Sequence, residues 1–130
     1  MQQLELFKYG TFTSHSGLKL NWKIECDALS ENEWDCLAAM IVERESRPFC
    51  KAEGIPRGGL PLAKALNKYA TNKEEDRILI CDDIWTTGRS FKEYTEEHYP
   101  DWIMNQGMRW VVFARKMPLD GTKALFSMNG

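Results

Sequence analysis

The chain has 130 residues, of which 43% are hydrophobic, and this size and composition suit one domain with its own core. Its formal net charge of -2 argues against nucleic acid as the main partner, because that role needs a basic excess. No apolar segment approaches membrane-spanning length, and the N-terminus lacks the pattern of a secretory leader. We therefore expect a cytoplasmic protein with no membrane partner.

The cysteines show no pattern typical of a metal site. They are Cys26, Cys36, Cys50 and Cys81, with neither a C-x-x-C pair nor a histidine at zinc spacing. We expect reduced, buried thiols.

The N-terminal part predicts a β-hairpin. Aromatic and β-branched residues between Phe7 and Asp27 surround a polar turn, so we assign residues 1–28 to a hairpin element of a single domain covering 1–130. Ser30 and Glu33 have the spacing of a capping box, which predicts the start of a helix. The apolar positions that follow at helical spacing are Trp34, Leu37, Ala38, Ile41 and Val42.

Strand and helix patterns then alternate along the chain. The predicted elements are a strand at 49–53, a loop at 54–59, a helix at 60–69, a strand at 78–81 with a turn and a helix after it, and strands at 108–114 and 123–128. This alternation is typical of α/β proteins and predicts a parallel sheet with right-handed crossovers. The polar segment at 94–104, interrupted by Pro100, predicts a loop.

The strongest functional signal follows the apolar strand residues at 78–81. Asp82 and Asp83 come first, and a turn rich in hydroxyl groups and glycine comes next. Such a turn, at the start of a helix, can bind phosphate through backbone N–H groups and hydroxyls. Two carboxylates would repel that phosphate unless the ligand also carries hydrogen-bond donors or a metal, and a ribose 5-phosphate has such donors. The candidate phosphate-binding residues are Thr86, Thr87, Gly88, Arg89 and Ser90.

This segment resembles the motif that binds 5-phosphoribosyl 1-pyrophosphate (PRPP) in type I phosphoribosyltransferases. It departs from the motif at Trp85, where the family usually has an aliphatic residue. The resemblance implies an α/β fold with a parallel sheet flanked by helices, reduced in size, and a small N-terminal hairpin or hood. It also implies that Asp82 and Asp83 hold the ribose hydroxyls and that the turn after them holds the 5′-phosphate.

A second loop has complementary chemistry. In Gly54–Gly59 the glycines allow close approach of an anion, and Arg57 offers a guanidinium fork. The loop is similar to the pyrophosphate loop of phosphoribosyltransferases, in the form found in xanthine-guanine enzymes, so Pro56, Arg57, Gly58 and Gly59 would bind pyrophosphate. The family often has a cis peptide bond there, which would fall at Pro56-Arg57. The resemblance implies Mg²⁺ bound mainly through PRPP, without a separate cluster of protein ligands.

The choice of base is less strongly indicated. Purine enzymes usually carry Asp where this chain has Thr86, and orotate enzymes carry Thr, so an orotate-like pyrimidine is favoured over a purine. Lys19, or Lys23, would suit an anionic base if these lysines are not simply solvated. Arg115 occupies the place where relatives contact the base, and Phe126 either stacks on the base or belongs to the core.

Three functions stay open. The first is a phosphoribosyltransferase that uses PRPP and a nucleobase, with a nucleoside monophosphate as product and a homodimer as its assembly. The second is a catalytically silent protein that binds PRPP or a nucleotide for regulation, because the segment at 70–76 is short and acidic where relatives have a long basic flap. Either Lys68 or Lys73 supplies part of that flap's charge, or the segment is simply a solvated connector. The third is an unrelated receiver-type domain, which the grouping of both acids and the threonines in one turn disfavours.

Overall fold

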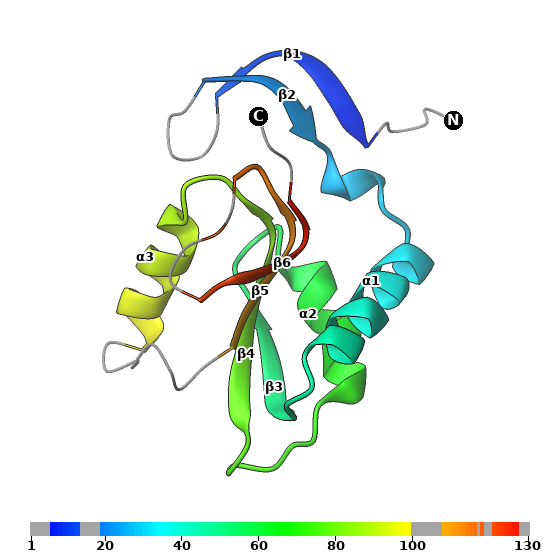
Figure 1. The fold of residues 1–130 in the computed structure, drawn as a ribbon, viewed down its shortest axis with the longest axis vertical. Coiled ribbons are helices and arrows are strands. Elements are labelled where there is room, and N and C mark those ends of the chain that lie inside the picture. The colour runs from blue at the N-terminus through cyan, green and yellow to red at the C-terminus, as the bar shows by residue number, and fades with distance from the viewer. Residues whose placement is uncertain (1–5, 14–18, 100–107, 117, 119–120, 128–130) are drawn as a thin grey trace.

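The chain forms two separate sheets. The computed structural model describes residues 6–13, 19–99, 108–116, 118 and 121–127, and for 7–10, 12–13 and 19–24 it describes the backbone alone. Strands β1 (Phe7–Thr13) and β2 (Lys19–Ile24) pair antiparallel, which confirms the predicted hairpin. Figure 1 shows this hairpin beyond one end of the larger sheet.

The larger sheet has four parallel strands, so the predicted α/β class is confirmed. Its order is β3 (Phe49–Gly54), β4 (Arg77–Trp85), β5 (Met108–Ala114) and β6 (Lys123–Ser127). Because all four strands run the same way, their carboxyl ends meet at one edge of the sheet. That edge is where parallel α/β sheets place ligands.

The helices begin close to where the sequence predicts them. They are α1 (Glu31–Arg44), α2 (Leu60–Leu66), α3 (Arg89–His98) and the short 3₁₀ helices η1 (Cys26–Ala28) and η2 (Asn67–Tyr69). The capping box at α1 is present, because the Glu33 N–H donates to Ser30 Oγ at 3.2 Å and the Ser30 N–H donates to Glu33 Oε1 at 2.9 Å. No helix in the described ranges is long and apolar enough to cross a membrane.

One predicted loop is in part a helix. Residues 94–98 belong to α3, and Tyr94 packs against the core while its ring stacks on His98 at 4.2 Å. Tyr94 lies three residues after the buried Phe91, which is helical spacing, so the apolar side of α3 extends one turn further than its polar sequence indicates. Residues 100–104 of that predicted loop lie outside the described residues.

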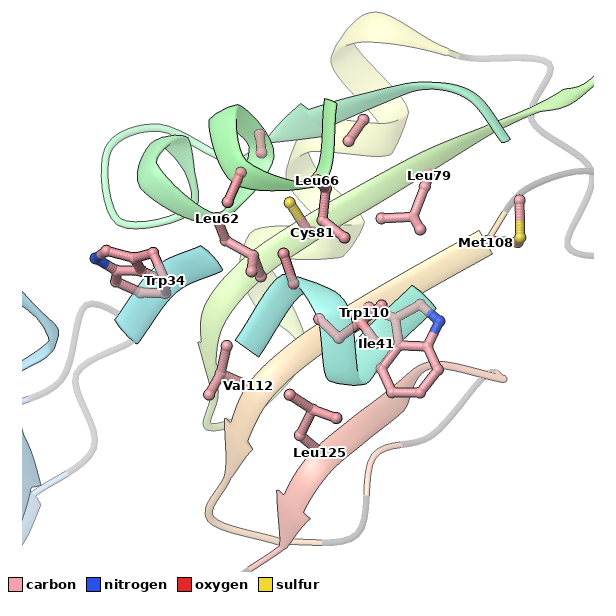
Figure 2. Close-up of a cluster of buried hydrophobic side chains, with 14 of the residues drawn as sticks. Trp34, Ile41, Leu62, Leu66, Leu79, Cys81, Met108, Trp110, Val112 and Leu125 are labelled. Carbon is pink, nitrogen blue, oxygen red and sulfur yellow. The ribbon is translucent and has the colours of Figure 1, made fainter. Parts of the chain in front are cut away.

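Side chains from α1 and α2 pack on one face of the sheet to form the main core (Figure 2). Ile41, Leu62 and Leu66 are fully buried there against Leu79 and Val112 of the strands. Helix α3 covers the opposite face, where Phe91 packs in a second cluster with Ile80, Trp85 and Val111. The free cysteines divide between environments: Cys26 and Cys81 are buried, whereas Cys50 is half-buried and Cys36 exposed, so the prediction of buried thiols is wrong for Cys36.

The prediction of right-handed crossovers throughout is wrong. Both connections, β3 to β4 through α2 and β4 to β5 through α3, advance in the same direction across the sheet. Because α2 and α3 lie on opposite faces, the two crossovers have opposite hands, and one is left-handed.

The chain after α2 explains this exception. The side chain of Asn67 pairs with the backbone of Ala52, accepting from its N–H at 2.8 Å and donating to its carbonyl at 2.9 Å. The N–H groups of Thr71 and Asn72 then donate to the carbonyls of Phe49 and Cys50, at 2.9 and 3.0 Å. These residues hydrogen-bond the backbone groups of β3 on the side that faces away from β4, where a further strand would otherwise pair. The chain then turns back to form β4.

Candidate functional site

The acidic pair lies at the carboxyl end of β4, and its two members have different environments. Asp82 is only 7% exposed, whereas Asp83 is half-buried. The N–H of Asp83 donates to Asp82 Oδ1 at 2.8 Å, and the N–H of Ile84 donates to Asp83 Oδ1 at 2.8 Å. Burial, together with the hydrogen bond and charge of Asp83, raises the pKa of Asp82 far above its usual range. Asp83 is therefore the member with an open face for a ligand, and Asp82 lies behind it.

The turn after β4 leads directly into α3. Gly88 caps the helix with φ 85° and ψ 0°, a left-handed conformation that favours glycine. Thr87 Oγ1 accepts from the N–H of Arg89 at 3.4 Å, while Thr86 and Ser90 are half-buried. Since α3 has ten residues and begins at Arg89, its positive end points toward the turn, which suits an anion such as phosphate.

Arg89 differs from the other residues of this turn. Its guanidinium Nε donates to Glu93 Oε1 at 2.6 Å along the exposed surface of α3, so its side chain is paired along the helix. Arg89 can still offer its backbone to the turn. The spacing of four residues between Arg89 and Glu93 in a helix is the sequence signal that could have indicated this pairing.

The second loop folds back against the end of β4. The N–H of Ile55 donates to the Cys81 carbonyl at 2.9 Å, and the N–H of Gly59 donates to the Ile55 carbonyl at 2.9 Å. A Cβ atom on Gly58 would lie 2.5 Å from Asp83 Oδ2, so only glycine allows the loop to approach the acid this closely. The Pro56-Arg57 peptide bond is cis, as predicted, and the side chains of Pro56 and Arg57 are exposed.

A cavity of about 230 Å³ lies between this loop, the acidic pair and the chain that leaves the hairpin. Asp83, Arg57 and Gly58 line one side of it, and Trp34 and Pro61 line another. Its remaining lining is the segment at 25–27, which no sequence motif singles out. Cys26 in that segment is buried, and burial together with the nearby Asp83 charge and hydrogen bond raises the pKa of its thiol.

The candidate residues for binding the base lie in different environments. Arg115 lies next to the site turn, because its N–H donates to the Trp85 carbonyl at 2.9 Å. It is 8% exposed, and burial lowers the pKa of its guanidinium. Phe126 is 40% exposed and stacks on Phe113 with ring centroids 5.6 Å apart. The side chain of Lys19 lies outside the described part of the structure, as does that of Lys23.

The flap candidates lie away from the site. Lys68 pairs with Asp35 at 2.7 Å, and Lys73 belongs to the connector that leads to the amino end of β4. In a parallel sheet the amino ends of the strands lie on the side opposite to their carboxyl ends, and Asp83 lies at the carboxyl end of β4. The positions of these lysines favour the alternative that this segment is a solvated connector, because it leads to the amino end of β4.

Sequence comparison identifies no relative: no protein-family model matches the chain, and no curated protein matches it. Solved structures do match in fold. The chain is similar to UMP synthase of Leishmania donovani, with 21% identity and a TM-score of 0.71 over 94% of this chain. It spans 33% of that protein's length.

Two shorter proteins match over most of their own length. The orotate phosphoribosyltransferase of Aeropyrum pernix shares 17% identity and a TM-score of 0.71, with 94% of this chain and 88% of that chain covered. A phosphoribosyltransferase of Corynebacterium diphtheriae shares 10% identity and a TM-score of 0.64, with 90% and 88% covered. With both loops at the carboxyl edge of a parallel α/β sheet, the chain has the fold of type I phosphoribosyltransferases.

Proposed function

We propose that this protein binds PRPP and transfers its phosphoribosyl group to a nucleobase, with an orotate-like pyrimidine favoured over a purine. The observation that carries the proposal is the meeting of two loops: Gly58 lies against Asp83, and the phosphate turn continues from the same strand. An acid between two anion-binding loops suits a ligand with a phosphate, hydroxyl donors and a second phosphate group. The similarity to an orotate phosphoribosyltransferase in fold supports the same reading.

Different residues bind different parts of the ligand. Asp83 accepts hydrogen bonds from the ribose hydroxyls, and Asp82 holds Asp83 in place through the 2.8 Å backbone bond. The turn from Thr86 to Ser90 binds the 5′-phosphate at the start of α3. Arg57, exposed beside the cavity, binds the pyrophosphate together with the loop that contains Gly58.

In the proposed reaction a base nitrogen attacks C1 of PRPP, the bond from C1 to the pyrophosphate oxygen breaks, and pyrophosphate leaves with the electron pair. Positive charge develops on the ribose as that bond lengthens. The negative carboxylate of Asp83 stabilises this positive charge, and the guanidinium of Arg57 stabilises the negative charge of the leaving group. The remaining contribution is positional, because both ends of the ligand are held by backbone loops at one sheet edge.

Magnesium fits this site as a companion of the substrate. In the part of the chain that the structure describes, no three His, Cys, Asp or Glu side chains gather to enclose an ion, whereas the open carboxylate of Asp83 faces the cavity. Mg²⁺ commonly binds through phosphate oxygens, water and one or two carboxylates. When bound it would neutralise pyrophosphate charge, with Asp83 as the protein group beside it.

Three residues bear on the base. Thr86 cannot act as a proton acceptor near neutral pH, which disfavours the purine reaction that uses an acid there. Arg115 is fixed at the end of β5 next to the turn, where its cation suits an anionic pyrimidine. Lys19 in β2 would add a second cation from the hairpin side. We further propose a cytoplasmic enzyme that acts as one domain with its hairpin as a hood, and a homodimer as its assembly.

The placement of the connector favours a second candidate function. Since the segment at 70–76 follows the β3 edge and joins the amino end of β4, it does not cover the pyrophosphate position. A segment in that position cannot exclude water from the reacting centre as a closed flap does. A regulatory protein that binds PRPP or a nucleotide without turnover would need the same residues and no flap.

A paired assay tests both functions. Pyrophosphate release is measured with PRPP, Mg²⁺ and orotate, uracil or a purine base, and PRPP binding is measured by calorimetry. Asp83→Asn keeps the Oδ1 acceptor for Ile84 and removes the charge, so binding should weaken by about tenfold or more. Asp35→Asn removes an acid that pairs with Lys68 outside the site and serves as the matched control.

The outcomes separate the candidates. Pyrophosphate release with orotate, lost in Asp83→Asn and kept in Asp35→Asn, supports the transferase. Binding that depends on Asp83 without release for any base supports the regulatory function. If the wild-type protein binds neither PRPP nor ribose 5-phosphate, both proposals fail.

A further inference from the structure

Trp85 is the residue at which the acidic segment departs from the motif that it resembles, and the structure shows what its large side chain contacts. The indole is 6% exposed at the end of β4. Its ring lies 5.7 Å from that of Phe91 in α3, with an angle of 39° between the planes. Trp85 thus belongs to the core beneath the turn that begins with the next residue.

The indole also lies directly against the backbone of the phosphate turn. A Cβ atom placed on Gly88 would come within 2.4 Å of Trp85 Cη2 and 2.5 Å of Cζ2. Gly88 is the residue with φ 85° that caps α3, so the ring touches the turn at its most constrained point. Glycine is required there both by the backbone conformation and by the ring.

The backbone of Trp85 is held as well. Its carbonyl accepts from the N–H of Arg115 at 2.9 Å, which ties the end of β4 to the residue that follows β5. The indole therefore projects from a fixed point between two strands. A ring held at its base and packed against Phe91 cannot shift without disturbing Gly88.

We propose that Trp85 is a positioning residue that supports the phosphate turn from below and sets where its N–H groups lie, an inference that rests on the proposed function. A smaller aliphatic side chain leaves space beneath Gly88, and the turn loses the surface that orients it. Phosphate binding by a backbone turn depends on placement within a fraction of an ångström. The second loop shares the core cluster of Trp85 only through Ile55. Its Gly58 and Gly59 lie against Asp83 and the Cys81 carbonyl, so its binding of pyrophosphate should change much less.

Calorimetric titrations with ribose 5-phosphate and, separately, with pyrophosphate, both in Mg²⁺, test this inference. Trp85→Leu should weaken ribose 5-phosphate binding by about tenfold or more and change pyrophosphate binding by less than about threefold. Trp85→Phe keeps a ring and should weaken ribose 5-phosphate binding by about fivefold, beyond the margin of about threefold allowed for the control, without weakening pyrophosphate binding, so it tests the inference if the leucine variant does not fold. Ile80→Ala, in the same cluster, is the control for lost core packing and should leave both affinities within about threefold.

A double mutant adds a readout that general destabilisation does not move. Gly88→Ala should weaken ribose 5-phosphate binding less in the Trp85→Leu background than in the wild type, because the clash with the ring is gone. Equal losses for both ligands in Trp85→Leu, or the same pattern in Ile80→Ala, would overturn the inference. Failure of the wild-type protein to bind ribose 5-phosphate would instead overturn the proposed function and this inference with it.

Discussion

Replacing Asp82 by Asn should make the stability of the protein less dependent on pH. The Asp82 carboxyl is 7% exposed, and burial, with the hydrogen bond and charge of Asp83, raises its pKa from 3.8 to about 9. A carboxyl whose pKa is higher in the folded state favours folding when protonated. Its favourable contribution is complete below pH 3.8 and is lost progressively as the pH rises toward about 9. Asn keeps the Oδ1 acceptor for the Asp83 N–H and does not titrate.

The size of the effect follows from proton linkage. Within that window the folded state holds up to one more proton than the unfolded state, so the free energy of unfolding falls by at most about 1.4 kcal/mol per pH unit. Between pH 5 and pH 7 the upper limit is therefore about 3 kcal/mol. The two carboxyls share the shift and the site relaxes, so we expect about 1–2 kcal/mol.

Urea unfolding of both proteins at several pH values from 5 to 8 measures this effect. Titrating groups that do not interact with Asp82 cancel in the difference between the two free energies of unfolding, and this difference should move in favour of Asp82→Asn as the pH rises. Glu96→Gln, an exposed position on α3, serves as the control for loss of an acid at the surface. A difference that is flat between pH 5 and 8, or that moves in favour of the wild type, would refute the reasoning.

Three further changes test the local structure. Gly88→Ala should lower the free energy of unfolding by about 1–3 kcal/mol in urea titrations, because φ is 85° and the new Cβ would meet Trp85; an unchanged midpoint would contradict this conformation. Asn67→Ala should cost about 1–3 kcal/mol, since the Ala52 N–H and carbonyl lose both partners, and faster hydrogen exchange at the Ala52 amide should accompany the loss. Ser30→Ala should cost about 1 kcal/mol through loss of the helix cap, with Ser30→Asp close to the wild type in thermal unfolding; equal melting temperatures for Ala and Asp would argue against the cap.

Features that depend on neighbours in sequence could be predicted from the sequence. The capping box at Ser30 and Glu33 needs only three residues of spacing, and the structure contains both of its hydrogen bonds. The phosphate turn could be predicted for the same reason, because a strand, two acids and the glycine-rich start of a helix are consecutive in the chain. The fold class followed from the alternation of such local patterns. The end of α3 was missed because Tyr94 is the only apolar residue among residues 92–98.

Features that depend on distant segments required the tertiary structure. The approach of Gly58 to Asp83 and the entry of Cys26 into the cavity arise because separate elements end at one sheet edge. The opposite hands of the crossovers follow from the chain after α2 binding the outer edge of β3, which local periodicity cannot encode.

The sequence by itself therefore determined the chemistry of the site: two acids, an anion-binding turn and a second glycine-rich loop. Only the tertiary structure decided how these groups differ from one another. It buried Asp82 and left Asp83 open, and it placed the Trp85 ring under Gly88. The physical reason is that residue type sets what a group can bind, whereas burial and packing against remote segments set its charge state, its position and its access to a ligand.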